Sequence, residues 1–430
     1  MKEMTLAPAS SPISGELQVP GDKSISHRAI ILGSLAEGTT TITQFLISED
    51  TSRTVEAFRR LGVEIEEKGT SLKIHGRGLA ALQEPYEPIY FGNSGTTARL
   101  MLGVLAGMPF FTSAYGDPHL TRRPMDRVVE PLSAMGGHFD GRNNGSYLPL
   151  AVRGGNLKGI HYTLPVKSAQ VKSAVLLGGL FAEGTTEITE ETPSRNHTEN
   201  MLEAFGADIK TSGCHIQMTG ESSLAATDVT VPGDISSAAF FMAAAAIVPG
   251  SKLTLRRVGL NHSRTGIIDV LIEMGTQVSI ANKQTIGGET FGDITIAHRP
   301  LKATVIESDI IPRLIDELPV IALIASQAEG ETIIRDAEEL RLKETDRIQA
   351  TVDGLNRIGA DVEPTADGMI INGKSALTGG QAKAYHDHRI AMMLAIASLI
   401  AKQKVVIDDV SSIAISYPDF FQHLRDITNR

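Results

Sequence analysis

The sequence repeats two kinds of helix–glycine–strand junction, and this repetition limits the possible folds more than any other feature. The first kind is an apolar helix end, a small turn and a β-rich run, as in LAEGTTTI after Leu35. Its turn glycines are Gly38, Gly107, Gly184, Gly250 and Gly330, spaced by 69, 77, 66 and 80 residues. A sixth copy, LIAKQKVVI, lacks the glycine. Glycine after a helix supplies the left-handed C′ conformation, and the Thr/Ile/Val run predicts a strand.

The second kind of junction interleaves with the first, as in FRRLGVEIE and LNRIGADVEP. Its glycines are Gly62, Gly136, Gly206, Gly275 and Gly359, spaced by 74, 70, 69 and 84 residues. Any α/β chain contains some helix–glycine–strand junctions, but the two series keep step. They predict about six copies of a βαβ-rich unit, which is too large for a solenoid repeat.

A longer repeat indicates how the six units are grouped. The sequence VPGD occurs at Val19–Asp22 and again at Val231–Asp234, 212 residues later, each time before a serine-containing helix start. Three units of about 70 residues fill this interval. We therefore predict an α/β (α+β) protein with two domains of three units each. Domain II is residues 21–232, and the discontinuous domain I is residues 1–20 plus 233–430, with crossovers near the two VPGD segments.

Composition excludes several classes of function. The formal net charge is −10, which disfavours nucleic acid or an anionic membrane surface as a partner, although a local basic site remains compatible. The single cysteine, Cys214, excludes an internal disulfide and a multi-cysteine zinc site. The longest apolar runs, Ala238–Pro249 and Ile390–Ala401, are shorter than the roughly 20 residues of a membrane helix. The N-terminus has no apolar export region, so we expect a soluble cytoplasmic protein.

Small and basic residues recur where helices are predicted to begin. In GDKSISHR, residues 21–28, Asp22 or Ser24 can cap a helix whose N-terminus favours an anion, and Lys23 and Arg28 add positive charge. This pattern suits a phosphate but lacks the Walker A spacing. Comparable segments are residues 91–99 (FGNSGTTAR), 122–124 (RRP), 168–173 (SAQVKS) and 194–197 (SRNH). Taken alone, each of these segments is better explained by an ordinary capped helix or a solvated charge pair, except residues 91–99, for which the two interpretations are about even.

The second half of the chain adds carboxylates to this pattern. Asp316 precedes the predicted apolar helix 318–325, where it can cap the helix or act as a base. In LKETDR, Lys343 and Arg347 share a face if the segment is helical, with Glu344 beside them. His386 and His388 give only a weak metal signal. Together the basic residues of an acidic chain predict a polyanionic pair of substrates, with Asp316 and Glu344 for acid–base chemistry; they are Lys23, Arg28, Arg123, Arg195, Lys343, Arg347 and Arg389.

These motifs carry a resemblance to a known family. GDKSISHR, GNSGTTAR, SAQVKSA, LKETDRI and HDHRIAM match, in order and over about the whole chain, the motifs of the 3-phosphoshikimate 1-carboxyvinyltransferases. LKETDR together with DHRxAM is highly specific. The resemblance implies the two-domain enolpyruvyl transferase fold, with six βαβαββ units in pseudo-threefold domains. It also implies transfer of the enolpyruvyl group of phosphoenolpyruvate to the 5-hydroxyl of shikimate 3-phosphate, with release of phosphate.

The resemblance also implies roles for individual residues. Catalytic roles fall to Asp316, Glu344, Lys343 and Lys23. The residues expected to bind shikimate 3-phosphate are Lys23, Ser24, Arg28, Ser168, Ala169, Gln170, Ser194, Arg195, Asp316 and Lys343. The residues expected to bind phosphoenolpyruvate are Lys23, Gly95, Arg123, Gln170, Arg347, His388 and Arg389. No metal or organic cofactor is implied, and we expect a monomer that binds the inhibitor glyphosate, because Gly95 leaves space beside phosphoenolpyruvate.

The chain departs from some members of the family at a few positions. Ala169 stands where some have a second serine, Glu339 where some have asparagine, and Leu100 where others have proline. Ile415 stands where some have a lysine, which puts one contact to phosphoenolpyruvate in doubt. Arg195 is similar to the variant of the family that uses arginine beside Ser194 for the ring.

Two alternatives stay open at this point. A UDP-N-acetylglucosamine enolpyruvyltransferase shares the fold and the phosphoenolpyruvate chemistry, but it typically has a cysteine or aspartate on a mobile loop near the arginine-rich segment. Here that segment is AYGDPHLTRRP, which offers only Asp117. A non-catalytic anion-binding module is the other alternative, and the presence of Asp316, Lys343 and Glu344 disfavours it.

Overall fold

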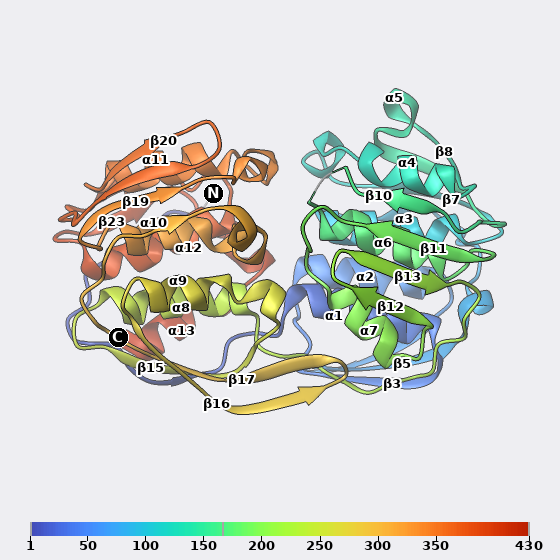
Figure 1. The fold of residues 1–430 in the computed structure, drawn as a ribbon, viewed down its shortest axis with the longest axis horizontal. Coiled ribbons are helices and arrows are strands. Elements are labelled where there is room, and N and C mark those ends of the chain that lie inside the picture. Colours follow the sequence, from blue (N-terminus) through green and yellow to red (C-terminus); the bar gives the residue numbers. More distant parts are fainter. Residues whose placement is uncertain (1, 166, 429–430) are drawn as a thin grey trace. The chain divides into compact units, whose positions relative to one another are not determined.

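The structure is a computed structural model that describes residues 2–165 and 167–428. The chain forms two compact units (Figure 1). Unit 1 consists of Met1–Pro20, Pro232–Gln284 and Thr290–Arg430. Unit 2 consists of Gly21–Val231 and Thr285–Glu289. The chain passes from one unit to the other within both VPGD segments.

Each unit contains three small sheets with a common topology. The sheets of unit 2 have the strand orders β14-β3-β5-β4, β6-β7-β9-β8 and β10-β11-β13-β12. In each, the first two strands are parallel and the other two join in antiparallel fashion. The strands are β3 (Glu37–Thr43), β4 (Glu64–Lys68), β5 (Ser71–Arg77), β6 (Ile89–Tyr90), β7 (Phe111–Tyr115), β8 (His138–Gly141), β9 (Tyr147–Arg153), β10 (His161–Thr163), β11 (Thr185–Thr189), β12 (Ile209–Ser212), β13 (His215–Thr219) and β14 (Val229–Thr230).

Unit 1 repeats this arrangement with a shortened last copy. Its sheets have the orders β16-β17-β15-β2, β18-β19-β21-β20 and β1-β23-β22, and in the last sheet the N-terminal strand β1 pairs antiparallel with β23. The strands are β1 (Met4–Leu6), β2 (Ser14–Leu17), β15 (Lys252–Gly259), β16 (Gln277–Ile286), β17 (Glu289–Ala297), β18 (Val305–Ile306), β19 (Gly330–Ile334), β20 (Asp361–Pro364), β21 (Met369–Gly373), β22 (Gly380–Ala382) and β23 (Val405–Ile407).

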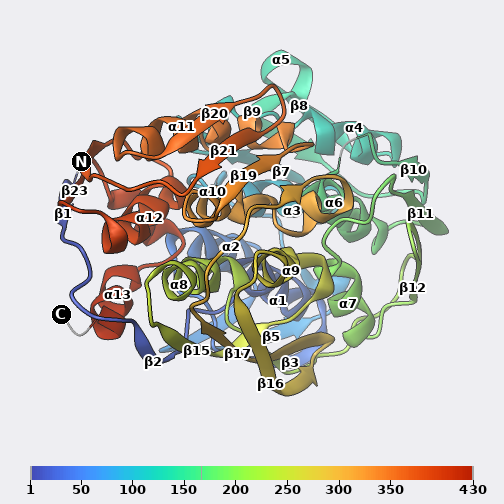
Figure 2. The ribbon, with the colours of Figure 1, turned by 60° about the vertical axis from the view of Figure 1, so that its left-hand side comes forward.

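Three inner helices form the core of each unit. In unit 2 these are α1 (Lys23–Leu35), α3 (Gly95–Ala106) and α6 (Ala169–Gly179), and α3 lies beside α6 (Figure 1). In unit 1 they are α8 (Ile235–Ile247), α10 (Leu318–Ala325) and α12 (His388–Ala397), which pack against one another (Figure 2). Every residue of α8 and of α10 is buried. These sequences are apolar on all sides, as expected of helices surrounded by protein.

The remaining helices are shorter or have one exposed face. In unit 2 they are α2 (Glu49–Arg60), α4 (Asp126–Ala134), α5 (Arg142–Gly145) and α7 (His197–Ala204), and in unit 1 they are α9 (Gly266–Glu273), α11 (Arg347–Arg357) and α13 (Phe420–Thr428). Among the described residues, no helix is both long enough and apolar enough to cross a membrane.

The repeat glycines have the expected backbone conformation at all positions except Gly107. The other nine have positive φ, as at Gly62 (+87°) and Gly359 (+100°). At Gly107 φ is −81°, so the prediction of a left-handed residue there is wrong. A Cβ atom at Gly107 would lie 2.2 Å from Cγ of Phe181. Close packing of an aromatic ring, rather than a left-handed turn, therefore requires glycine at this position.

One short segment that the sequence analysis placed in domain I belongs to unit 2 in the structure. The turn between β16 and β17, Thr285–Glu289, belongs to unit 2. There Gly288 has φ +80°, and a Cβ atom on it would lie 2.6 Å from the carbonyl oxygen of Asn200. Glu289 Oε1 lies 2.7 Å from Nδ1 of His197, and both side chains are buried. The chain thus crosses between the units twice more than the VPGD repeat predicts.

Candidate functional site

Most of the residues singled out from the sequence lie where inner helices begin. Asp22 caps α1, with Oδ1 accepting the Ile25 N–H at 2.9 Å, so Asp22 rather than Ser24 makes the side-chain cap. Ser94 caps α3 by accepting the Thr97 N–H at 3.2 Å. Asp387 caps α12 by accepting the Arg389 N–H at 2.8 Å. The backbone N–H groups of these first turns have no partner within their own helix, which favours anions nearby.

In unit 2, Arg28 is a buried cation on α1. Its Nε donates to Thr198 Oγ1 and its Nη2 to Ser173 Oγ, both at 2.7 Å. Burial lowers the pKa of its guanidinium to about 10, against the opposing effect of Glu199 and Asp22. Arg28 is thus charged at neutral pH, and neutral hydroxyl groups hold its orientation. Ser24, at the start of the same helix, is half-buried.

Two further cations of unit 2 are positioned by polar partners. Lys23 Nζ lies 3.1 Å from Oδ2 of Asp50, which lies near the start of α2. Arg99, on α3, donates from Nη1 to Oε1 of Gln170 at 2.7 Å. The Gln170 amide in turn donates to Thr96 Oγ1 at 3.0 Å, which fixes which way the amide points. The starts of α3 and α6 are therefore joined by side-chain hydrogen bonds.

The guanidinium of Arg123 lies against Gly95. A Cβ atom on Gly95 would lie 2.9 Å from Nη1 and 3.0 Å from Cζ of Arg123. Gly95 is the first residue of α3 and is buried, while Arg123 is half-buried. The absence of a side chain at residue 95 therefore lets an arginine approach the N-terminus of a helix.

The remaining predicted residues of unit 2 lie at α6 and before α7. Ser168 is the N-cap residue of α6, without a side-chain cap hydrogen bond, and Ala169 is half-buried. Ser194 and Arg195 lie in the segment before α7, and Arg195 is half-buried. Ser194 is 6% exposed, and its Oγ has no hydrogen-bond partner among the described residues. Nine other buried serine and threonine hydroxyls in the described part of the chain share this property, so it leaves the Ser194 hydroxyl available to a ligand without singling it out.

In unit 1, Asp316 lies among three cations. Its Oδ1 is 3.3 Å from Nη1 of Arg347 and 3.8 Å from Nζ of Lys343. Its carbonyl oxygen accepts a hydrogen bond from Nη1 of Arg389 at 2.9 Å. Asp316 belongs to the short 3-10 turn Ile315–Glu317, and Glu317 is the N-cap residue of α10. Asp316 is therefore not the N-cap of this helix, which was one of its two possible roles.

Arg347 is the centre of a buried charge network. Its side chain is 2% exposed, its Nε lies 2.7 Å from Asp387 Oδ2 and its Nη2 lies 2.5 Å from Glu344 Oε2. Burial acts to lower the pKa of the guanidinium, but the carboxylates of Asp387, Glu344 and Asp316 raise it above its ordinary value. Removing this cation would leave the fully buried carboxylate of Asp387 without its counter-charge, which typically costs about 3–5 kcal/mol.

The local structure around Lys343 differs from the sequence prediction. Lys343 follows the 3-10 turn Glu338–Leu342, and Arg347 is the first residue of α11. The two residues therefore do not share one helix face, although both approach Asp316. Asp346 between them caps α11 and breaks the helical run, which explains the error. His388 begins α12 and is buried.

The two groups differ in charge. The unit 2 group combines the cations Lys23, Arg28, Arg99, Arg123 and Arg195, with Asp50 paired to Lys23 and with Glu199 and Asp22 near Arg28. The unit 1 group places Lys343, Arg347 and Arg389 among the carboxylates Asp316, Glu317, Glu344 and Asp387. The first arrangement suits the binding of anions, and the second suits proton transfer beside charged reactants.

We compared the chain with known proteins. The family model for EPSP synthase (3-phosphoshikimate 1-carboxyvinyltransferase) matches residues 8–424. The 3-phosphoshikimate 1-carboxyvinyltransferase of Oceanobacillus iheyensis is 55% identical, over 99% of this chain and 100% of that protein. The Bacillus subtilis enzyme of the same name is 52% identical, over 97% and 98%. The chain belongs to the EPSP synthase family.

A solved EPSP synthase structure has the same fold. The structure from Acinetobacter baumannii has a TM-score of 0.91 and 44% identity, and the match covers 99% of this chain and 98% of that one. The predicted family, fold class and enzyme class are therefore confirmed.

The sequence analysis did not identify some residues of the two groups as site residues. Arg99 closes the motif GNSGTTAR, and its position one helical turn after Gly95 was the only signal for it. Asp50, the partner of Lys23, and Asp387, the partner of Arg347, are ordinary helix-start carboxylates in sequence. Their roles follow from partners 27 and 40 residues away.

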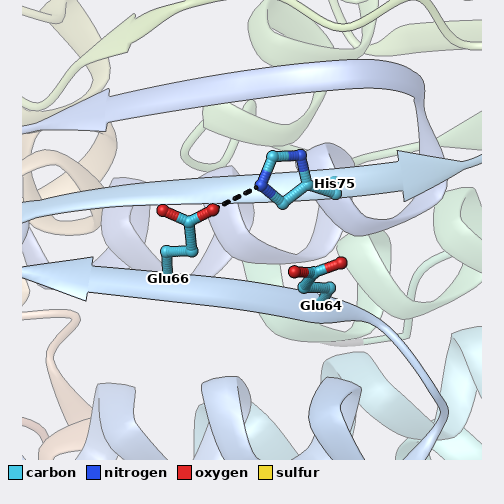
Figure 3. A group of neighbouring side chains, drawn as sticks. All are labelled: Glu64, Glu66 and His75. Atoms are coloured by element: carbon cyan, nitrogen blue, oxygen red, sulfur yellow. Dashed lines mark hydrogen bonds and ion pairs between the residues drawn. The ribbon is translucent and has the colours of Figure 1, made fainter.

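A possible metal-binding group lies apart from both groups. Glu64 and Glu66 on β4 and His75 on β5 place one ligand atom each within 4.8 Å of the others (Figure 3). His75 Nε2 lies 3.0 Å from Glu66, and Glu64 is opposite His75 in the strand register. Both glutamates are exposed, and Lys73 faces Glu66 across the strands. Cross-strand charge pairing accounts for this arrangement, and we assign no metal to it.

The buried His27 in GDKSISHR makes a testable prediction about acid stability. Its Nδ1 lies 2.7 Å from Thr54 Oγ1, and burial lowers the pKa of the imidazole from 6.5 to about 3, with Lys23 and Arg28 acting in the same direction and Asp50 against it. Between these values the unfolded chain binds the proton and the folded chain does not. The contribution of His27 is therefore complete above pH 6.5, and about 1.4 kcal/mol is lost per pH unit below it.

Urea unfolding of the wild type and of His27→Gln, measured between pH 7 and pH 4.5, checks this. The free energy of unfolding of His27→Gln should fall less steeply with acid, by about that slope. His75→Gln, on the surface of β5, controls for the loss of a histidine as such. Equal acid slopes for His27→Gln and the wild type would contradict the prediction.

Proposed function

We propose that this protein transfers the enolpyruvyl group of phosphoenolpyruvate to the 5-hydroxyl of shikimate 3-phosphate. We further propose that the unit 2 group mainly binds the substrate anions and the unit 1 group mainly transfers protons. Family membership supports the overall reaction. Within it, Ser24, Arg28, Ser168, Gln170, Ser194 and Arg195 bind shikimate 3-phosphate, with Lys343, and with the backbone of Ala169. Lys23, Gly95, Arg123, Arg347, His388 and Arg389 bind phosphoenolpyruvate, and Gln170 contributes to both.

The proposed mechanism is addition followed by elimination. The 5-hydroxyl oxygen attacks C2 of phosphoenolpyruvate, Asp316 accepts the hydroxyl proton, and Glu344 delivers a proton to C3. The tetrahedral intermediate then loses phosphate from C2 and returns a proton from C3 to Glu344, which restores the double bond. The contact of Asp316 with Lys343 and Arg347 is compatible with this role, because nearby cations favour the ionised carboxylate, which is the form that can accept a proton.

The observation that carries the proposal is the arrangement around Ser194 and Arg28. A buried hydroxyl without a partner among the described residues lies in the same unit as a buried, charged arginine that only neutral hydroxyl groups and a carbonyl oxygen are seen to bond. A phosphate group supplies the negative charge and the acceptor oxygens that such a site can use. The uncapped start of α6 adds backbone N–H groups.

Phosphate release from phosphoenolpyruvate tests the proposed reaction. The purified protein is given shikimate 3-phosphate or UDP-N-acetylglucosamine as the second substrate, and inorganic phosphate is measured. We expect phosphate release only when shikimate 3-phosphate is the second substrate. Release only with the nucleotide sugar would show that the ring-binding motifs were misinterpreted. No release with either substrate would favour the non-catalytic binding module, or a loss of activity caused by Ile415.

Gly95 gives a prediction about phosphoenolpyruvate and glyphosate. In Gly95→Ala the new methyl group must displace the guanidinium of Arg123 from the start of α3, since 2.9 Å is shorter than van der Waals contact. We expect the KM for phosphoenolpyruvate to rise several-fold and inhibition by glyphosate to weaken by a larger factor. Steady-state kinetics with glyphosate titrations measure both.

The KM for shikimate 3-phosphate serves as the internal control for this variant and should change little. Equal glyphosate inhibition of the wild type and Gly95→Ala would contradict the prediction.

A cytoplasmic location and a monomeric state stay predictions from the sequence.

A further inference from the structure

Lys172, in the first turn of α6, is a buried lysine held by two buried carboxylates. Its Nζ lies 2.8 Å from Glu190 Oε2 and 2.6 Å from Glu199 Oε1, and the three side chains are 1%, 4% and 4% exposed. Burying such charges costs several kcal/mol per ion, and a cation in the first turn also opposes the helix dipole. Well-packed apolar residues in place of such charges often leave a protein equally stable or more stable. Stability alone therefore does not account for this triad.

The triad holds both backbone groups of Ser194. Glu190 Oε1 accepts the Ser194 N–H at 3.2 Å, and Lys172 Nζ donates to the Ser194 carbonyl oxygen at 3.4 Å. The hydroxyl of Ser194 is left buried without a hydrogen-bond partner among the described residues. The pair Lys172–Glu190 therefore fixes the backbone at the residue whose side chain is proposed to bind the substrate.

Sequence neighbours of the triad also bond to Arg28. Ser173, next to Lys172, accepts from Arg28 Nη2 at 2.7 Å, and Thr198, next to Glu199, accepts from Arg28 Nε at 2.7 Å. The two hydroxyls lie 2.6 Å apart. Glu190 and Glu199 thus lie at the two ends of the segment that contains Ser194 and Arg195, and Lys172 joins those ends.

We propose that Lys172 and Glu190 are positioning residues for the recognition of shikimate 3-phosphate. They hold the segment 190–199 so that Ser194 and Arg195 meet the substrate in one fixed conformation. This inference rests on the proposed assignment of Ser194 to shikimate 3-phosphate. Within the described part of the chain, neither Lys172 nor Glu190 bonds to Gly95 or Arg123, so binding of phosphoenolpyruvate should be spared.

The test compares two buried carboxylates that share the same lysine. Glu190→Gln has a single acceptor oxygen for the Lys172 ammonium and the Ser194 N–H, so one of these donors loses its partner. Glu199→Gln neutralises the same kind of charge beside Lys172 but leaves the Ser194 hydrogen bonds in place, and it is the matched control. Because Glu199 also acts on the charge of Arg28, this variant measures the effect of the lost charge on the KM for shikimate 3-phosphate without the loss of a Ser194 partner. Steady-state KM values for both substrates are measured well below the melting temperature of each variant.

We expect Glu190→Gln to raise the KM for shikimate 3-phosphate about tenfold, as for the loss of one well-placed hydrogen bond, and the KM for phosphoenolpyruvate by less than about twofold. Glu199→Gln should lower the melting temperature comparably and raise the KM for shikimate 3-phosphate less than Glu190→Gln does. Should Glu190→Gln fail to fold, Glu190→Asp keeps the buried charge but withdraws the oxygen from Ser194, and it should give the same split.

Two results would overturn the inference. One is a parallel change of both KM values, or no change, in Glu190→Gln and Glu190→Asp, which would make the triad purely structural. The other concerns Ser194→Ala, which measures the underlying assignment by itself. An unchanged KM for shikimate 3-phosphate in Ser194→Ala would remove the proposed function of Ser194 and the inference with it, whereas a raised KM there with no effect at Glu190 would overturn the positioning role alone.

Discussion

The first turn of a buried helix has backbone N–H groups without partners in the helix, and the design of this protein depends on how six such turns are satisfied. Aspartate or serine side chains cap four of the inner helices, α1, α3, α8 and α12. The other two, α6 and α10, have no side-chain cap hydrogen bond. At α10 the protein supplies its own negative charge, Asp316 and Glu317. At α6 it supplies Ser168 and Gln170, and we propose that a substrate supplies the anion there.

This difference agrees with the division of charge between the units. Unit 2 gathers four arginines and one lysine. Hydroxyl groups orient Arg28, the Gln170 amide orients Arg99, and Asp50 pairs with Lys23. Unit 1 surrounds one buried arginine, Arg347, with three carboxylates, so that neither sign of charge dominates. A site that must bind two anions needs the first kind of group. A site that must move protons while phosphate leaves needs the second, because both charge states of a carboxylate must be tolerable.

The fold could be predicted from the sequence because its repeats are marked by backbone chemistry. The interleaved glycines gave the number of units, and the apolar run 318–325 coincides with α10. The failures are also physical. Gly107 follows a helix in sequence like its counterparts, yet packing against Phe181 rather than a left-handed turn explains it. The hairpin turn 285–289 joins unit 2 through His197 and Asn200, contacts that local patterns cannot reveal.

The candidate site shows the same limit. Residues at helix starts could be found from capping and charge patterns. Their partners could not, because Lys172 meets Glu190 and Arg28 meets Thr198 across 18 and 170 residues of sequence. A buried lysine in SAQVKSA is indistinguishable from a solvated one until the packing around α6 is known. Only the three-dimensional structure separates residues proposed to touch substrates from those that hold them in place.

The central claim is that unit 2 binds shikimate 3-phosphate while Asp316 in unit 1 acts in the chemistry. The most direct measurement is the dissociation constant of shikimate 3-phosphate together with the single-turnover rate in Asp316→Asn. The account predicts an affinity within about tenfold of the wild type, because Arg28 and Ser194 are intact, and a rate at least about 100-fold lower, as for loss of a general base. An unchanged rate, or a loss of affinity large enough to account for the whole loss of activity, would contradict it.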